Sequence, residues 1–288
     1  MANLRSDVTA VTVTLNGLPW IEQSLESLRG VETIVVDHGS TDGTVELVRE
    51  RFPDVRVIEQ ENRGYGAGLN AGFRASSPRY YLAINSDAWV TGDAVERMVA
   101  FADEHPEVAV VCPRLRYPDG RLHRSVRGFP TLWRVATEYF FLRKLAPRSR
   151  ALNAYYAGGF DHDEAREIDW AMGPCLLVRR EAADTVGLFD ESFFMFWEET
   201  DWLYRFHGAG WKIWFLPEAE AVHVGGATHG GRMYGENVTA LVGFFAKHHG
   251  ARAAARARRL LRTALALRGV LYRGERGRMY RDAARTLR

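Results

Sequence analysis

The sequence contains few cysteines and no long apolar run, and each absence argues against a class of protein. Cys112 and Cys175 lie far apart and show no spacing typical of a metal or redox site. A disulfide scaffold is therefore not expected. A reducing, cytoplasmic compartment is expected instead. No stretch approaches the ~18 apolar residues of a membrane span. The first residues also lack the apolar core of a signal peptide.

The net charge of +2 conceals an uneven distribution along the chain. Residues 251–288 hold twelve arginines and two acids, a net charge of +10, so the preceding 250 residues carry −8 of the total. Such a basic tail indicates an interaction. Its Leu and Ala recur among the arginines at helical spacing, which is typical of helices that lie on anionic lipid. A solvated helix or an oligomer contact is equally compatible, whereas no recognition motif supports binding to nucleic acid.

The first half of the chain alternates apolar strands with helical patterns. This order predicts an α/β fold, with a mostly parallel, Rossmann-like sheet covered by helices on both faces. Residues 114–168 are rich in Arg and aromatics and read as an insertion, with a helix near residues 132–145. We expect one domain over residues 1–250 and a basic helical tail over 251–288. The expected strands span residues 8–15, 33–37, 55–60, 80–85 and 108–112.

Three of these strands end in polar residues, where parallel α/β sheets bind ligands. The set is Thr14 and Asn16, Asp37, and Asn85 with Asp87. Asp37 is suited to accept the imide N–H of uracil or thymine, or a ribose hydroxyl. The alternative is a helix cap, which Asp42 fits better because Gly43 and a helical pattern follow it.

A glycine-rich segment, NRGYGAGLNAGFRAS, follows at residues 62–76. Its glycines allow close backbone approach, and the helix after them offers N–H groups to phosphate. Arg63 is placed to contact a nucleotide, although a solvated surface Arg is the alternative. A dinucleotide fingerprint belongs at the first strand–helix turn, where TLNGLPW stands, so a dehydrogenase is disfavoured. That turn also lacks the Arg/Lys-bearing glycine loop of a sugar nucleotidyltransferase.

Asp87 is the candidate metal ligand. Mg²⁺ or Mn²⁺ takes oxygen ligands and often needs only one or two carboxylates, because substrate phosphates complete the shell. Asn85 offers a carbonyl oxygen, or a hydrogen bond to a sugar hydroxyl, without adding charge. His223 ends a strand-like segment before Gly225, so contact with a metal or diphosphate competes evenly with a structural role.

The acidic cluster EETD at residues 198–201 opens a helical pattern. Acids are favoured at a helix start by the helix dipole alone. However, an acid beside Phe196, Trp197 and Trp202 is partly desolvated, which raises its pKa and suits a general base. Glu199 shares a helical face with Trp202, whereas Asp201 falls on the neighbouring one.

Taken in order, these motifs resemble the inverting glycosyltransferases of family 2, which have the GT-A fold. The resemblance runs from about Val8 to His223 and is nearest to the rhamnosyltransferase-like branch. It is carried by the ordered motifs VTVTLN, IVVDHGSTDGT, NRGYGAGLNAGF, LAINSDAWV, MGPCLLVRREA and GLFDESFFMFWEETDWLYRFHGAGWKIWFLPEAEAVHVGG.

The resemblance implies a role for each matching position. Glu199 occupies the place of the catalytic base, which in the family is usually an Asp, and Asp201 is the second candidate. By the same resemblance, Asp87 would be a metal ligand, and His223 would contact the metal or the diphosphate. The implied donor-binding residues are Thr14, Asn16, Asp37, Arg63, Asn70, Asn85, Ser86 and Gly173.

The resemblance also implies the reaction. A hexosyltransferase would move a sugar, rhamnose first, from a nucleotide-diphosphate donor to a hydroxyl of a glycan or lipid-linked acceptor of cell-wall or surface polysaccharide. dTDP-rhamnose is the first expected donor, a UDP-sugar the second, and Mg²⁺ or Mn²⁺ the expected cofactor. Such acceptors imply a cytoplasmic protein, peripheral on the inner face of the membrane. The alternative is a non-catalytic nucleotide-sugar-binding or regulatory protein, because the metal motif has lost one carboxylate.

Overall fold

The computed structural model describes residues 7–225 and 233–287, which divide into two compact units. Of the described residues, the first unit comprises 7–126, 161–194 and 198–225, and the second comprises 127–160, 195–197 and 233–287. The predicted insertion therefore contributes to both units, and the second contains most of it together with the C-terminal helices. The prediction of a domain boundary at residue 250 stays a prediction.

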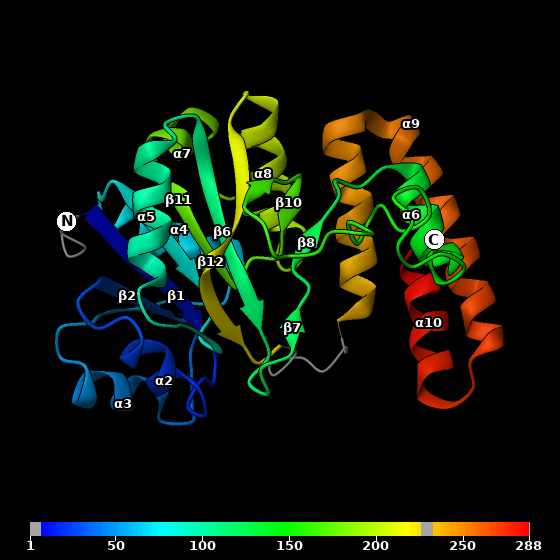
Figure 1. Ribbon diagram of the computed structural model, residues 1–288. Coiled ribbons are helices and arrows are strands. Elements are labelled where there is room, and N and C mark those ends of the chain that lie inside the picture. The colour runs from blue at the N-terminus through cyan, green and yellow to red at the C-terminus, as the bar shows by residue number, and fades with distance from the viewer. Residues whose placement is uncertain (1–6, 226–232, 288) are drawn as a thin grey trace. The chain divides into compact units, whose positions relative to one another are not determined.

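The first unit is built on one large mixed sheet (Figure 1). Its strands follow the order β3-β2-β1-β4-β11-β6-β12-β5, with β7 beside β6 and β9 beside β12. The strands are β1 (Val8–Thr14), β2 (Glu32–Asp37), β3 (Arg56–Glu59), β4 (Tyr80–Ile84), β5 (Ala88–Val90), β6 (Val108–Arg116), β7 (Leu122–His123), β9 (Arg166–Glu167), β11 (Cys175–Arg179) and β12 (Lys212–His223).

The pairing is parallel from β3 through β4, as the alternating sequence predicts. β11 runs antiparallel between β4 and β6, and β12 returns parallel to β6 before pairing antiparallel with β5. The strands from the second half of the chain are thus inserted among those of the first half. Their order could not be derived from hydrophobic pattern, because pattern gives burial and not the neighbour.

Every residue of β1 is buried, so both faces of the sheet are covered there. Val8 and Ala10 belong to a core cluster that includes Met98 and Val99 of α5. On the other face Val11 packs at Gly72 of α4, where an added Cβ would lie 2.3 Å from a Val11 methyl. The near-continuous Val/Ile/Leu/Ala runs of these strands reflect burial on both sides.

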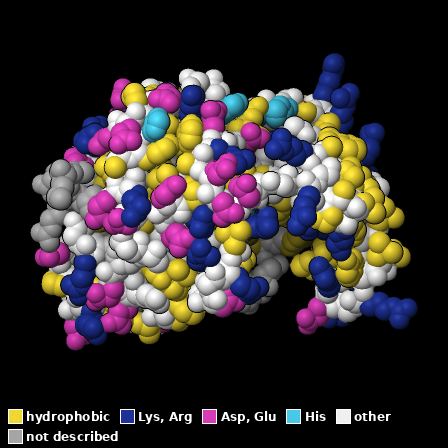
Figure 2. Space-filling model, viewed as in Figure 1, with side chains coloured by type: hydrophobic (Ala, Val, Ile, Leu, Met, Phe, Trp, Pro, Cys, Tyr) yellow, Lys and Arg dark blue, Asp and Glu magenta, His cyan; other side chains and the backbone are white. Residues whose placement is uncertain are grey.

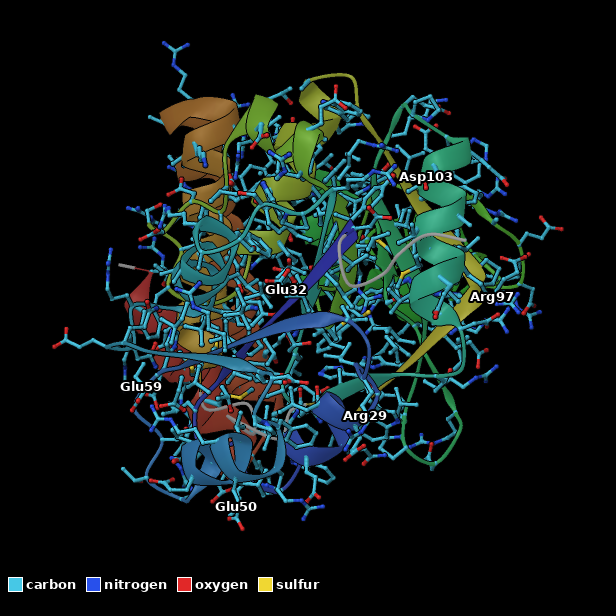
Figure 3. The ribbon with its side chains drawn as sticks, turned by 90° about the vertical axis from the view of Figure 1, so that its left-hand side faces the viewer. Arg29, Glu32, Glu50, Glu59, Arg97 and Asp103 are labelled. Atoms are coloured by element: carbon cyan, nitrogen blue, oxygen red, sulfur yellow. The ribbon has the colours of Figure 1, made fainter. Side chains whose placement is uncertain are left out.

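Helices of the first unit lie on both faces of the sheet, and the charged side chains around them point outward. Glu50 at the end of α3 and Glu59 at the end of β3 extend away from the body (Figure 3). The helices are α2 (Ile21–Glu26), α3 (Thr44–Arg51), α4 (Tyr65–Arg74), α5 (Ala94–Glu104), α7 (Arg180–Val186) and α8 (Glu198–Gly208).

The second unit is mainly helical. The side chain of Thr131 caps α6 by accepting a hydrogen bond from the backbone N–H of Arg134 at 3.1 Å. The helix expected near 132–145 is in fact α6 followed by a separate 3₁₀ turn, η1. The long helix α9 is interrupted at Gly250, whose φ of +79° is left-handed. The helices are α6 (Leu132–Tyr139), η1 (Leu142–Lys144), α9 (Tyr234–Leu271) and α10 (Gly274–Thr286).

Two short strands lie outside the large sheet. They are β8 (Val126–Arg127) and β10 (Trp170–Ala171). In the described part of the chain, we find no helix with the length and apolar character needed to span a membrane.

Candidate active site

The three predicted polar strand ends meet at one edge of the sheet. β2, β1 and β4 are neighbours in that order, and Thr14 at the end of β1 lies opposite Asp37 at the end of β2. β4 ends at Ile84, so Asn85 and its successors leave the sheet at the same edge. Ser86 lies close to β1 as well, because a Cβ added at Gly17 would be 3.6 Å from its hydroxyl.

Asp37 is fully buried and holds the turn that follows it. Its Oδ2 accepts hydrogen bonds from the backbone N–H groups of Gly39 and Ser40, both at 2.9 Å, and its Oδ1 accepts the Ser40 hydroxyl. Asn16 ties this turn to β1, since its N–H donates to Ser40 Oγ at 2.8 Å and its Oδ1 accepts from Thr41 N at 2.9 Å. The nucleotide-binding roles of these residues stay predictions.

Arg63 and Asn70 converge on Glu191. Arg63 pairs with that carboxylate at 2.9 Å while its own side chain remains 69% exposed, so a ligand can still reach it. Asn70 is fully buried and donates to Glu191 Oε1 at 3.0 Å and to the carbonyl of Phe189 at 2.9 Å. Its Oδ1 accepts from Phe189 N at 3.0 Å. These bonds give Asn70 a structural contact with the 189–191 segment, and its predicted donor contact is untested.

The glycines of the glycine-rich segment face protein. Gly64 has a φ of +102°, and a Cβ there would lie 2.3 Å from the carbonyl oxygen of Phe194. Gly68 likewise abuts Val13 and His38. The glycines thus admit neighbouring segments of the chain, which differs from the expected open approach to phosphate. Because these glycines let the chain approach closely, Tyr65 lies at the start of α4 with its backbone N–H donating to the carbonyl oxygen of Phe194 at 3.0 Å.

Tyr65 connects the start of α4 to the residues after β4, and its role was not predicted from the sequence. Its hydroxyl donates to Asn85 Oδ1 at 2.6 Å. The Asn85 amide nitrogen lies 3.5 Å from His223 Nε2, which in turn lies 3.4 Å from Asp87 Oδ1. A hydroxyl-bearing aromatic directly after a glycine turn was the signal available. Nothing in the sequence showed that it would point at the end of β4.

Asp87 and His223 are brought together as candidate metal ligands. Both are nearly buried, at 8% and 6% exposed, and the His223 ring stacks on His123 with centroids 5.3 Å apart. His223 Nδ1 has no hydrogen-bond partner within the described residues. Those residues contain no group of three or more His, Cys, Asp or Glu arranged for a metal. The pair therefore fits an ion that takes its other ligands from a diphosphate and water.

The two candidate bases have different surroundings. Asp201 is fully buried and pairs with Arg205 at 2.9 Å, and Arg205 also donates to the carbonyls of Val186 and Leu188. This network fixes α8 to the segment before it. Glu199 instead lies beside Gly173, where an added Cβ would be 3.5 Å from its Cγ. The absence of a side chain at Gly173 leaves room next to this carboxylate.

Burial and negative charge dominate the electrostatics of the site. Burial raises the pKa of Glu198 well above its ordinary value, and the neighbouring Glu199 raises it further. Burial also raises the pKa of Tyr65, followed by the negative charges of Glu198, Glu199 and Asp87. The pKa of Tyr65 therefore depends both on the candidate metal ligand Asp87 and on the acidic pair Glu198 and Glu199 at the start of α8. The chain enters α8 through two left-handed residues, Phe196 (φ +68°) and Trp197 (φ +72°), a strained backbone of the kind found at functional sites.

This arrangement agrees with the comparisons to known proteins. The sequence pattern described as glycosyl transferase family 2 matches residues 9–187. The chain belongs to this family. One relative in it, from Mycobacterium tuberculosis, is named N-acetylglucosaminyl-diphospho-decaprenol L-rhamnosyltransferase. It is 33% identical over 230 residues, which cover 74% of this chain and 74% of the relative. The chain is thus a glycosyltransferase of family 2.

Solved structures of glycosyltransferases share the fold. The mannosyltransferase PcManGT from Pyrobaculum calidifontis, in complex with GDP-Man and Mn²⁺, superposes with a TM-score of 0.59 at 19% identity. The match covers 98% of this chain and 85% of that one. S. aureus TarS 1-349 in complex with UDP-GlcNAc gives a TM-score of 0.58 at 17% identity, covering 96% and 79%. These likenesses confirm the predicted GT-A architecture.

Proposed function

We propose that this family 2 glycosyltransferase moves rhamnose from a nucleotide diphosphate to a hydroxyl of a lipid-linked N-acetylglucosamine acceptor in cell-wall synthesis. The observation that carries this proposal is the 33% identity, over three quarters of both chains, to a relative named for that reaction. dTDP-rhamnose is the first donor and a UDP-sugar the second. The nucleotide-binding edge would be formed by Thr14, Asn16, Asp37 and Arg63, with Asn85, Ser86 and Gly173 near the sugar.

In the proposed mechanism, Glu199 takes the proton from the acceptor hydroxyl. The oxygen attacks the anomeric carbon from the face opposite the diphosphate, so the configuration inverts as the C–O bond to the diphosphate breaks. Glu199 is favoured over Asp201 because the Asp201 carboxylate is fully buried and already paired with Arg205. Burial and the neighbouring Glu199 raise the pKa of Glu198, so the fold disfavours a second negative charge beside Glu199.

A divalent cation, Mg²⁺ or Mn²⁺, would be held by Asp87 with help from His223. When bound, it neutralises the charge that develops on the leaving diphosphate. Asp87 Oδ1 and His223 Nε2 lie 3.4 Å apart, which supports the proposal that both side chains bind one ion. Tyr65 donates a hydrogen bond to the amide oxygen of Asn85, so Asp87 is the proposed oxygen ligand of the ion.

A calorimetric panel of nucleotide sugars, with and without Mn²⁺, tests the donor. Tight, Mn²⁺-dependent binding of dTDP-rhamnose above UDP-sugars is expected, and preference for another nucleotide would overturn the donor assignment. Glu199→Gln should bind donor as the wild type does but lose about 10²–10⁴ in turnover, the usual size of general-base assistance. Glu50→Gln, an exposed carboxylate at the end of α3, is the matched control and should keep full activity.

The alternative function is a non-catalytic nucleotide-sugar binder. Wild-type protein that binds the donor but neither hydrolyses it nor transfers its sugar would support that alternative.

A lipid-linked acceptor would be held in a membrane, so the enzyme would have to act at the membrane surface. We therefore propose a peripheral location on the cytoplasmic face of the membrane, where such an acceptor would be reached.

A further inference from the structure

The outer face of α9 in the second unit combines arginines with exposed large apolar side chains. Leu267, Val270 and Leu271 are 51%, 82% and 72% exposed. They recur at the helical spacing that places residues on one side. Figure 2 shows hydrophobic and Lys/Arg side chains together over this unit. An open hollow on α9 is lined by Arg262, Thr263, Ala266, Leu267 and Val270.

The same stripe continues toward the start of the helix as arginines. Exposed residues recur every three or four positions, so one helix face runs from basic to apolar. The last acid of α9 is Glu236, so no carboxylate of the helix itself offsets these charges. No acidic side chain in the described residues pairs with the arginines of the stripe. The stripe comprises Arg252, Ala255, Arg256, Arg259, Arg262, Thr263, Ala266, Leu267, Val270 and Leu271.

The opposite face of α9 is fixed within its own unit, so the stripe stays outward. Ala257, Leu261 and Leu265 are fully buried, and α9 packs on α6 and α10. Arg268 is buried too, and donates to the carbonyls of Tyr139 and Glu138 at 2.8 and 2.7 Å. The arginines of the helix therefore divide into one that packs the unit together and a set that faces solvent.

We propose that this stripe docks the protein on a bilayer that contains anionic lipid. The arginines would meet lipid phosphates, while Leu267, Val270 and Leu271 enter the boundary between headgroups and acyl chains. Charge argues for this occupant, because a face of basic and apolar side chains without acids complements an anionic surface that is apolar beneath. The inference deepens the proposed use of a lipid-linked acceptor, since it would bring the enzyme to the layer that holds it.

Vesicle flotation of the full chain tests the proposal without needing transfer activity. The wild type should float with vesicles of phosphatidylglycerol and phosphatidylcholine at low salt, and should not float with phosphatidylcholine alone. The triple variant Leu267→Gln/Val270→Gln/Leu271→Gln should lose flotation. Each of Arg252→Gln, Arg256→Gln, Arg259→Gln and Arg262→Gln should weaken binding by about fivefold, the usual effect of one basic residue near an anionic surface.

Two controls separate docking from other causes. Four exposed arginines of the first unit (Arg29, Arg49, Arg97 and Arg121), changed together to Gln, remove four positive charges, more than any stripe variant, and should leave flotation unchanged. Unchanged thermal melting shows that the stripe variants fold. Wild type that stays unbound to anionic vesicles, or binding unaffected by the triple variant, would overturn the inference. So would a dimer in light scattering that the triple variant dissociates without any vesicle binding. Donor hydrolysis, measured without acceptor, reports on the proposed function separately.

Discussion

Glu198 lies at the first turn of α8, only 5% exposed, and its Oε2 has no hydrogen-bond partner in the part of the chain that the structure describes. Burial, and then the neighbouring Glu199, raise its pKa well above 4.5. We expect Glu198→Gln, a neutral side chain of nearly the same shape, to stabilise the protein at neutral pH. The gain arises because the substitution removes a carboxyl group that the fold disfavours in its charged form.

The sign and size follow from proton linkage. Below pH 4.5 both folded and unfolded chains keep this proton, so the group costs nothing. As pH rises above 4.5 the unfolded chain releases the proton while the folded protein retains it. Glu198 therefore lowers the free energy of unfolding by about 1.4 kcal/mol per pH unit, until the folded pKa is reached. Between pH 5 and pH 7 this amounts to at most ~2.7 kcal/mol.

Urea unfolding at pH 5, 6 and 7 measures the effect as a difference between variant and wild type. Other titrating groups are common to both proteins and cancel. The difference should be small at pH 5 and should grow with pH in favour of Glu198→Gln, at an unchanged urea dependence. Glu50→Gln, which removes an exposed carboxyl, should show no such trend. A Glu198→Gln difference that is independent of pH would refute the raised pKa and the proton placed on Glu198.

Three further predictions concern packing and the metal. Asp201→Asn leaves Arg205 without its buried carboxylate, and the free energy of unfolding should fall by about 3 kcal/mol in urea melts; a loss near zero would contradict a structural role for Asp201. Gly72→Ala forces a Cβ to within 2.3 Å of Val11 and should cost ~1–3 kcal/mol. Gly208→Ala, in open space at the end of α8, should cost nothing and serves as its control. Asn85→Asp adds a carboxylate beside Asp87 and should tighten Mn²⁺ binding on the order of tenfold in paramagnetic resonance titrations; unchanged affinity would place residue 85 away from the ion.

The first four strands could be predicted from the sequence because each contains consecutive apolar or β-branched residues and is bounded by polar or turn residues. The convergence of Thr14, Asp37 and Asp87 on one edge followed directly from that, since parallel strands share a carboxyl end. Tyr65 could not be predicted, because its role depends on Gly64 bringing Phe194 close and on the direction of one side chain. The burial of Asn70 was also unreadable, since its partners Phe189 and Glu191 are more than a hundred residues away.

The structure of the second half of the chain was harder to predict from the sequence, for a different reason. Cys175–Arg179 has the pattern of a buried strand, but pattern does not say that it runs antiparallel between β4 and β6. The predicted tail began at Ala251, just after the left-handed Gly250 that interrupts α9. Glycine marked that break in the sequence, whereas the packing of α9 on α6 rests on long-range contacts that hydrophobic periodicity does not encode.

The strand order has a consequence for synthesis of the chain. β4 and β6 are synthesised early, but β11, the strand that lies between them, consists of residues 175–179 and is synthesised later. β5 likewise has no partner strand until β12 is synthesised. A ribosome adds residues in order at ~5–20 per second, so the emerging half-sheet exposes unpaired strand edges for several seconds. His223, the last residue of β12, completes both the sheet and the predicted metal pair with Asp87. The nascent chain can therefore acquire its proposed catalytic centre only when the sheet closes, and a chain cut short of that residue would be both inactive and prone to pair with other edges.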